Sequence, residues 1–333
     1  MERILLVRTH AIGDVLLTTP AVKAARKIYP DAKIDYLTTK WSKEAITLNP
    51  NIDEIIAVDD DVFFSKNPTK IIKLVKELKK RNYDRIYAFH RSKKIHLLCK
   101  LIGNKVTGIS DGDFNPFLDE KIVLKRENSN YVADDYLKMF NIEIENSSLE
   151  FYWSKEDEIF IDNLIGDLRF VCVAPGGAHN PAESVWQKLW KVENFIKVIK
   201  YLKNRKEKVI IVGGKSDEKI CKEIEEKCEI LNLCGKLTLK HLGVLLKRSK
   251  FLLTNDSAPL HIAVAVNTPV IGLFGPTSPD VLLPKRENII AIRSDAECSP
   301  CYVNRRFKGC KKPICMDMIT TDKVISVIEK KFY

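Results

Sequence analysis

Polar residues that could hold a phosphate group follow two apolar runs late in the chain. Asn255-Asp256-Ser257 comes directly after the first run, and Thr277 lies in a loop rich in Gly and Pro after the second. Each run is typical of a buried parallel strand, and Pro259 suits the first turn of a helix. A helix start offers free N–H groups and the positive end of the helix dipole. The sequence therefore predicts an anion-binding edge at the carboxyl ends of two parallel strands.

A third apolar run, 170–174, is followed by Pro175 and then by Gly176 and Gly177. Glycines in this position let a ligand approach the backbone closely. Lys188 follows in the next segment and adds a positive charge to it. The alternative is that these loops are ordinary turns of an α/β domain and that Lys188 is a solvated charge at a helix start.

A carboxylate that could act as a base lies near the N-terminus. Asp14 comes after the apolar run 3–7 and a loop that contains Gly13. At the carboxyl edge of a sheet, its side chain could accept a proton from a ligand hydroxyl. A helix start should keep its pKa low, so its value as a base would come from its position. Two alternatives stay open: Asp14 is a helix N-cap, or His10 is the base.

Strands alternate with helices throughout the chain, which predicts an α/β fold with doubly wound parallel sheets. A chain of 333 residues exceeds the usual size of a single core, so we expect two domains, 1–155 and 156–333. The expected strands are 3–7, 33–37, 54–58, 85–89, 105–107, 170–174, 208–212, 229–233, 251–253 and 270–274. The expected helices are 15–28, 42–48, 69–80, 93–102, 130–140, 217–227, 239–247, 260–266 and 322–332, and 111–126 is expected to form irregular loops over the ligand-facing rim.

Three stretches resemble one family of enzymes. The pattern R-x-x-x-x-G-D-x-L-x-x-x-P-A begins at Arg8, and P-G-G is followed by K-x-W at Lys188-Leu189-Trp190. The last stretch begins at Asn255 with N-D-S-x-P-x-H-x-A and continues from Gly272 with G-L-F-G-P-T-S-P. Together they are similar to signatures of glycosyltransferase family 9, the bacterial lipopolysaccharide heptosyltransferases, and the resemblance covers nearly the whole chain. The sequence departs from the family at Ala258, where Gly is usual.

The resemblance implies two Rossmann-like domains facing a cleft, the GT-B arrangement, in which the final helix often crosses back to the first domain. It implies an inverting transferase that needs no metal or cofactor for catalysis and moves a heptose, or a related sugar, from an ADP-sugar to a lipid-linked core oligosaccharide. Asp14 would be the general base. The donor would bind in the C-terminal domain to Gly176, Gly177, Lys188, Asp256, Ser257, Ala258, Pro259, His261 and Thr277. The acceptor would bind in the N-terminal domain to Arg8, His10, Gly13 and Arg91, although Arg91 could equally be a solvated charge.

Other classes of function are less well supported. A nucleotide-sugar epimerase of the same fold would need an acid and base pair that the sequence does not identify, and a non-catalytic nucleotide-sugar-binding protein of envelope assembly is the other alternative. Neither G-x-G-x-x-G nor a P-loop follows a first strand, which argues against a dinucleotide oxidoreductase. The net charge of +11 favours an anionic partner such as a nucleotide or a phosphorylated lipid surface. No reader motif accompanies that charge, so we expect no nucleic-acid partner.

Composition also bears on location and on metal binding. The first apolar run is too short for a signal peptide, so we expect a cytoplasmic protein with peripheral contact to the inner membrane face. Nine cysteines agree with a reducing compartment, and the sequence leaves the oligomeric state open. Four cysteines near the C-terminus could hold a structural zinc, form a redox-sensitive disulfide or remain free thiols. They are Cys298, Cys301, Cys310 and Cys315.

Overall fold

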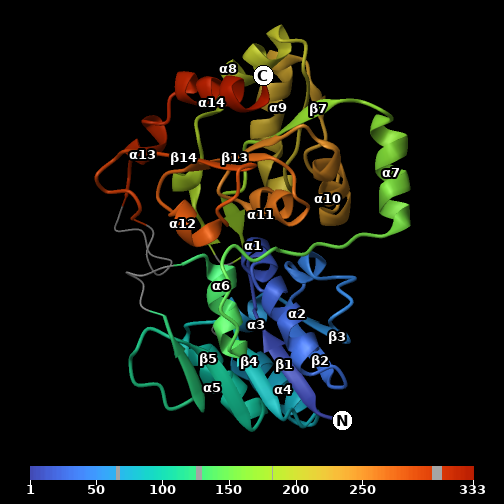
Figure 1. Ribbon diagram of the computed structural model, residues 1–333, viewed down its shortest axis with the longest axis vertical. Helices are drawn as coiled ribbons and strands as arrows, with labels where there is room; N and C mark the ends of the chain where they lie inside the picture. Colours follow the sequence, from blue (N-terminus) through green and yellow to red (C-terminus); the bar gives the residue numbers. More distant parts are fainter. Residues whose placement is uncertain (65–67, 125–129, 182, 302–309) are drawn as a thin grey trace. The chain divides into compact units, whose positions relative to one another are not determined.

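The computed structural model describes residues 1–64, 68–124, 130–181, 183–301 and 310–333. The chain forms two compact units, Met1–Tyr152 and Trp153–Tyr333, which we call unit 1 and unit 2 (Figure 1). Each unit contains one six-stranded sheet in which every neighbouring pair of strands is parallel. This confirms the prediction of an α/β fold with two doubly wound parallel sheets.

The sheet of unit 1 has the strand order β3-β2-β1-β4-β5-β6. Its central strand β1 is buried along Ile4–Val7, because helices cover both faces of a doubly wound sheet. Helix α2 packs against α6, and α4 packs against α5. The elements are β1 Arg3–Val7, α1 Ile12–Leu16, α2 Thr19–Ile28, β2 Lys33–Thr39, β3 Glu54–Val58, α3 Asp61–Phe64, α4 Pro68–Lys79, β4 Arg85–Ala88, α5 Lys93–Ile102, β5 Lys105–Ser110, β6 Glu120–Val123 and α6 Val132–Leu137.

The structure corrects three expectations for unit 1. The helix expected at 15–28 is divided into α1 and α2, since the hydroxyls of Thr18 and Thr19 bond to backbone carbonyls at the break. The segment 42–48 forms only a 3-10 turn, Lys43–Ala45. The stretch expected to be all loop contains β6, a charged edge strand that pairs with β5 alone. Its sequence Glu-Lys-Ile-Val lacks the apolar run by which buried strands are found.

The sheet of unit 2 has the strand order β11-β10-β7-β12-β13-β14. Strand β14 and helix α7 were not expected, and β11 is shorter than predicted. A reciprocal cap between Ser154 and Asp157 begins α7. The elements are α7 Lys155–Ile165, β7 Phe170–Ala174, α8 Val192–Asn204, β10 Lys208–Ile211, α9 Glu218–Cys228, β11 Leu231–Asn232, α10 Leu239–Arg248, β12 Leu252–Asn255, α11 Ala258–Ala265, β13 Val270–Phe274, α12 Pro279–Leu282, β14 Ile289–Arg293, α13 Ile314–Asp317 and α14 Thr321–Phe332, with a short antiparallel pair β8 His179–Asn180 and β9 Glu183–Ser184.

The final helix α14 packs on α8 within unit 2. The ring of Phe332 stacks on Phe251 at a centroid distance of 4.2 Å. The hydroxyl of Tyr333 donates to Glu207, 2.6 Å away. These contacts bind the last turn of α14 to the sheet of unit 2.

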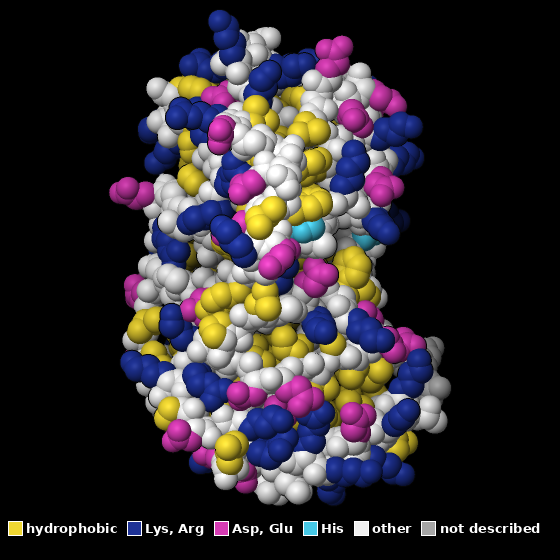
Figure 2. Space-filling model, turned by 90° about the vertical axis from the view of Figure 1, so that its right-hand side faces the viewer, with side chains coloured by type: hydrophobic (Ala, Val, Ile, Leu, Met, Phe, Trp, Pro, Cys, Tyr) yellow, Lys and Arg dark blue, Asp and Glu magenta, His cyan; other side chains and the backbone are white. Residues whose placement is uncertain are grey.

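The surface carries mixed charges. On the face drawn in Figure 2, Lys and Arg side chains are interspersed with Asp and Glu, and hydrophobic side chains reach the surface between them. Within the described ranges, no helix is both long and apolar enough to span a bilayer.

Candidate functional site

Three neighbouring strands of unit 2 end at the edge where the predicted donor residues lie. Strand β12 lies between β7 and β13, and the loops after all three strands leave the same edge. The side-chain amide of Asn255, at the end of β12, donates to the carbonyls of Pro175 and Gly176 at 2.7 and 3.2 Å. Its oxygen accepts from the backbone N–H of Trp190 at 3.2 Å. Asn255 therefore ties the glycine loop, the segment after Lys188 and the end of β12 together.

Gly177 must be glycine in this arrangement. Its φ of +96° lies in the region that L side chains rarely adopt. A Cβ atom on Gly177 would also lie 2.2 Å from the Cβ of Ser257, at the start of α11. The loop after β7 and the start of α11 thus approach each other without a side chain between them. Gly176, Gly177 and Ser257 come together here as the sequence predicted.

Lys188 and Asp256 form a buried ion pair at this edge. The Lys188 Nζ lies 2.8 Å from Asp256 Oδ2, and the hydroxyl of Thr277 donates to the same oxygen at 2.8 Å. Burial alone would raise the pKa of Asp256, but the charges of Lys188 and His261 and the hydrogen bonds from Lys188 and Thr277 together lower that pKa below its usual value. Asp256 is therefore ionised at neutral pH. The alternative of a solvated Lys188 does not hold, because its side chain is only 18% exposed.

The remaining predicted donor residues lie on α11. Ala258 is its first residue and Pro259 its second, as expected for a proline in the first turn. The Nε2 atom of His261 lies 3.9 Å from Asp256 Oδ1 and adds favourable charge when protonated. Ser257 occupies the N-cap position, but its side chain does not cap the helix and instead lies 3.2 Å from the hydroxyl of Thr254.

The lowered pKa of Asp256 makes a prediction about stability and pH. A carboxylate with a depressed pKa stabilises the folded state at pH values above its unfolded pKa of about 4, and this contribution is lost as pH falls further. We expect the difference in melting temperature between the wild type and Asp256→Asn to be constant from pH 5 to 7 and to shrink below about pH 4. Thermal unfolding at half-unit steps of pH measures this difference. A difference that stays constant down to pH 3 would contradict the assigned charge.

Asp217 is a site residue that the sequence did not single out. Its side chain is buried, and its two oxygens accept from the backbone N–H groups of Gly177 at 3.1 Å and Gly214 at 2.9 Å. Gly214 lies in the loop after β10, the strand on the other side of β7. Asp217 thus links the glycine loop after β7 to the glycine loop after β10. Its position at a helix start is also typical of an N-cap, which is why the sequence alone did not reveal this role.

Replacing Asp217 with Asn should loosen the glycine loop. An amide presents only one acceptor oxygen, so one of the two backbone N–H groups would face another donor. We expect Asp217→Asn to lower the free energy of unfolding by about 1–3 kcal/mol and to weaken nucleotide binding. Chemical denaturation and calorimetric titration measure the two effects. Asp322→Asn, which alters an exposed carboxylate in the first turn of α14, is the matched control and should change neither.

The edge of unit 1 carries the predicted base. Asp14 is the third residue of α1, not its N-cap, which is Ala11. The guanidinium of the buried Arg8 forms a hydrogen-bonded ion pair with the Asp14 carboxylate and donates to the carbonyl of Phe89 at 2.5 Å. Burial alone would lower the pKa of Arg8, yet the Asp14 charge raises it, so Arg8 is always a cation. The pair fixes both the direction and the charge of the Asp14 carboxylate.

Two histidines lie beside this pair, of which the sequence identified one. The Nδ1 atom of His10 is 2.8 Å from the Thr9 hydroxyl, and the backbone N–H of Thr9 donates to His90 Nε2 at 3.0 Å. The two imidazole rings are 5.9 Å apart. His90 follows β4, the strand next to β1, and no motif marks it.

The other predicted acceptor residues lie on the same edge. Gly13 is the second residue of α1. Arg91 follows the end of β4 and donates to Asp111 Oδ1 at 2.5 Å and to the carbonyl of Leu124 at 2.7 Å. Arg91 is therefore not an isolated solvated charge, because it fastens the loop after β5 to the segment before α5.

The four C-terminal cysteines show no assembled metal site. Among the described residues, no group of three or more His, Cys, Asp or Glu side chains is arranged to hold a metal ion. The structure shows no disulfide among Cys298, Cys301, Cys310 and Cys315, and burial raises the pKa of Cys315. Residues 302–309, between the second and third cysteine, lie outside the described part of the chain. A structural zinc stays a prediction.

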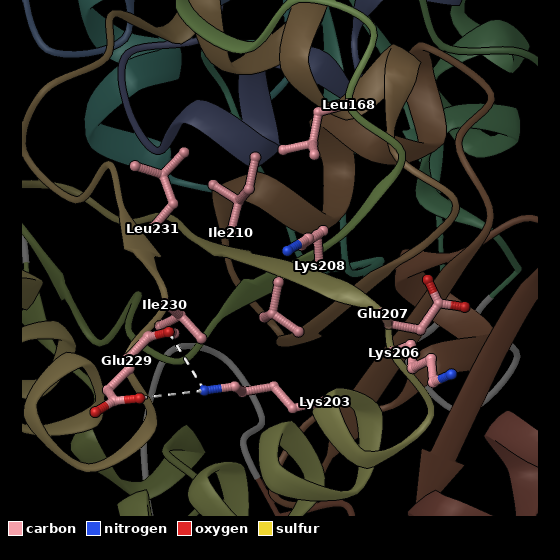
Figure 3. A pocket seen from close by; sticks show the side chains of 10 residues that line it. Leu168, Lys203, Lys206, Glu207, Lys208, Ile210, Glu229, Ile230 and Leu231 are labelled. Carbon is pink, nitrogen blue, oxygen red and sulfur yellow. Dashed lines mark hydrogen bonds and ion pairs between the residues drawn. The ribbon is translucent and has the colours of Figure 1, made fainter.

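A hollow of about 490 Å³ lies elsewhere on unit 2, at the amino ends of β10 and β11 (Figure 3). It is separate from the candidate site, since parallel strands begin and end at opposite edges. The Lys203 ammonium points to Glu229 across it and contacts the backbone carbonyl of Glu229 at 3.4 Å. Its lining residues are Leu168, Lys203, Lys206, Glu207, Lys208, Val209, Ile210, Glu229, Ile230 and Leu231.

Comparison with known proteins gives the family. Residues 71–311 match the model of glycosyltransferase family 9 (heptosyltransferase). Lipopolysaccharide heptosyltransferase 3 of Escherichia coli K12 is 31% identical over 297 residues, which are 84% of each chain. The structure of a glycosyl transferase of family 9 from Veillonella parvula is 25% identical, with a TM-score of 0.82 over 99% of this chain and 96% of that one.

A second solved structure agrees in fold. The E. coli heptosyltransferase WaaC, solved with ADP-2-deoxy-2-fluoro heptose, is 18% identical, with a TM-score of 0.72 over 98% of this chain and 99% of that one. The family match covers most of the chain and is to a family of transferases. It therefore favours a transferase over the two alternatives, an epimerase and a non-catalytic binding protein. The chain belongs to glycosyltransferase family 9, the heptosyltransferases, and is a transferase enzyme.

Proposed function

We propose that the protein transfers a heptose, or a closely related sugar, from an ADP-sugar to a core acceptor of lipopolysaccharide. The observation that carries the donor half of this proposal is the cluster of Lys188, Asp256 and Thr277 beside Gly177 at one edge of the unit 2 sheet. It joins a cation, a hydroxyl and a glycine backbone where a parallel sheet binds its ligands. The fold neighbour WaaC was solved with an ADP-heptose analogue, which supports ADP as the nucleotide.

In this proposal, unit 2 holds the diphosphate without a divalent metal. The first N–H groups of α11 and the backbone of Gly176 and Gly177 donate to phosphate oxygens. Lys188 has three N–H donors and gives one of them to Asp256, so its ammonium can contact a phosphate while it stays paired. Asp256 positions Lys188, and this positive charge stabilises the ADP that leaves.

Unit 1 supplies the base. A hydroxyl of the acceptor attacks the anomeric carbon of the donor sugar as the bond from that carbon to ADP breaks, and the hydroxyl proton passes to Asp14. Attack from the face opposite the leaving group inverts the anomeric configuration. Arg8 pairs with the Asp14 carboxylate and aims it. The contribution of the carboxylate comes from placing a proton acceptor beside the attacking oxygen.

The direct test is transfer with purified components. The protein is incubated with ADP-heptose and a heptose-deficient core lipid in the presence of EDTA, and the product is analysed by mass spectrometry and NMR. We expect a lipid one heptose heavier, with inverted anomeric configuration and one ADP released per transfer. Release of ADP without a change in the mass of the lipid would overturn the proposed acceptor. A reaction that requires added Mg²⁺ would overturn the metal-independent mechanism.

A further inference from the structure

We propose that one surface of unit 1, formed by α5 and the loop after β5, binds an anionic phospholipid bilayer. We call it the α5 surface, and it consists of Lys93, Lys94, Leu97, Leu101 and Phe114. All five side chains are exposed: Leu97 is 40% exposed, Leu101 50% and Phe114 81%. An apolar stripe of this kind, bordered by lysines, is typical of helices that lie in a membrane interface.

The geometry of α5 places these side chains on one face. Lys93, Leu97 and Leu101 are four residues apart, so they lie in one row along the helix. The core side of α5 is formed by His96, Leu98, Cys99 and Ile102, which are buried. The exposed row therefore lies outside this buried side of α5.

Hydrogen bonds tie the loop that carries Phe114 to α5. The side-chain amide of Asn115 lies 2.7 Å from His96 Nδ1, on α5. The ion pair of Arg91 with Asp111 fastens the start of the same loop to the segment just before α5. The backbone on either side of Phe114 is thus fixed, while the phenyl ring projects into solvent.

Helix α5 is basic, Lys100 on it pairs with Asp119, and the exposed Asp113 adjoins Phe114 in the loop after β5. Helix α5 contains three lysines and no acidic residue, and Lys93 and Lys94 form no ion pair with any carboxylate in the described part of the chain. Helix α4 packs against α5 (Figure 1) and contributes further exposed lysines. They are Lys70, Lys73, Lys76 and Lys79. Basic side chains near a bilayer are attracted to anionic headgroups.

A bilayer fits this surface better than a nucleic acid does. Both partners are anionic and would attract the lysines, but only a bilayer gains from burying the aliphatic side chains of Leu97 and Leu101. Helix α7 of unit 2 provides a contrast, since its exposed Ile159 and Leu164 lie among acidic side chains that anionic lipids repel.

The position of the surface relates to the proposed function without depending on it. Lys93 and Lys94 follow the carboxyl end of β4, the neighbour of β1, so the α5 surface adjoins the edge that carries Asp14. A bilayer bound here would lie beside the edge proposed to receive a lipid-linked acceptor. Phospholipid binding itself requires neither donor nor acceptor.

Flotation with vesicles tests the proposal on the whole protein. We expect wild-type protein to bind vesicles of phosphatidylglycerol and phosphatidylethanolamine and to bind pure phosphatidylcholine at least about tenfold more weakly. Leu97→Ser/Leu101→Ser/Phe114→Ser should lower the partition coefficient about tenfold or more. Lys93→Gln/Lys94→Gln should lower it severalfold and weaken its dependence on salt, and this variant keeps the test valid if the triple variant unfolds.

The matched control is Ile159→Ser/Leu164→Ser, which removes two exposed aliphatic side chains from the acidic helix α7 and should leave vesicle binding unchanged. Equal partition of the wild type and both α5 variants would overturn the proposal. Binding of the wild type to duplex DNA but not to anionic vesicles would also overturn it and assign the surface to nucleic acid. ADP titration tests the proposed donor site separately, because the donor residues belong to unit 2.

Discussion

Replacing Asp14 with Asn is expected to slow sugar transfer by about 10²–10⁴-fold while the affinity for ADP stays unchanged. The amide has nearly the shape of the carboxylate and can still accept a hydrogen bond from Arg8, but it cannot take a proton from an acceptor hydroxyl. ADP binding should be unaffected because the proposed nucleotide residues all belong to unit 2. Single-turnover transfer rates and calorimetric titration with ADP measure the two quantities.

The choice of Asn over Ala matters for this experiment. Arg8 is buried, and Asp14 → Ala would leave its guanidinium without its carboxylate partner, which destabilises a protein strongly. Asp53→Asn is the matched control, because Asp53 also accepts from an arginine, Arg26 at 2.6 Å, but lies just before β3 at the opposite edge of the same sheet. If Asp14→Asn retained transfer at the rate of Asp53→Asn, Asp14 would not be the base. His10, beside the pair, would then be the next residue to replace.

Replacing Lys188 with Ala is expected to lower the affinity for ADP by about 10- to 100-fold, which corresponds to the loss of a hydrogen bond to a charged group. Calorimetric titration with ADP, UDP, GDP and CMP, without divalent metal, measures both the loss and the selectivity of the wild type. We expect ADP to bind most tightly. Lys191→Ala is the matched control, since Lys191 is also ion-paired, with Asp317, but is largely exposed.

The loss of affinity must be separated from a loss of stability, because Lys188→Ala leaves the Asp256 charge buried without its main partner. Burial would then raise the pKa of Asp256. The double variant Lys188→Ala/Asp256→Asn removes that buried charge, so it should recover much of the melting temperature without recovering ADP affinity. Recovery of ADP affinity in the double variant would show that Lys188 acts only through folding and does not contact the diphosphate.

Much of this architecture could be predicted from the sequence because buried parallel strands are short apolar runs. Strands such as 170–174 and 270–274 were located to the residue. Strand β6 was missed because it is a charged edge strand, and the break before α2 was missed because its apolar spacing continues across Thr18 and Thr19. Hydrophobic patterns reveal which segments are buried, and they do not reveal local hydrogen bonds that end a helix.

Site residues could be predicted where their role depends only on the local backbone conformation. Gly177 and Pro259 are examples, since backbone conformation decides both. The partner of Lys188 could not be predicted, because its ion pair with Asp256 joins residues far apart in the chain. Asp217 and His90 were missed for the same reason: each resembles an ordinary cap or turn residue until the neighbouring strand is in place.

The Asp217 carboxylate, which bonds to the glycine loop after β7, also restricts which residues related sequences can carry at position 176. A Cβ atom on Gly176 would lie 2.1 Å from the Cγ of Asp217, so no side chain can appear at position 176 while that carboxylate remains. A side chain at position 176 would therefore require a smaller residue at position 217 or a displaced Asp217 carboxylate. Positions 176 and 217 should therefore vary as a pair among related chains, although they lie in different loops of the sheet, after β7 and β10.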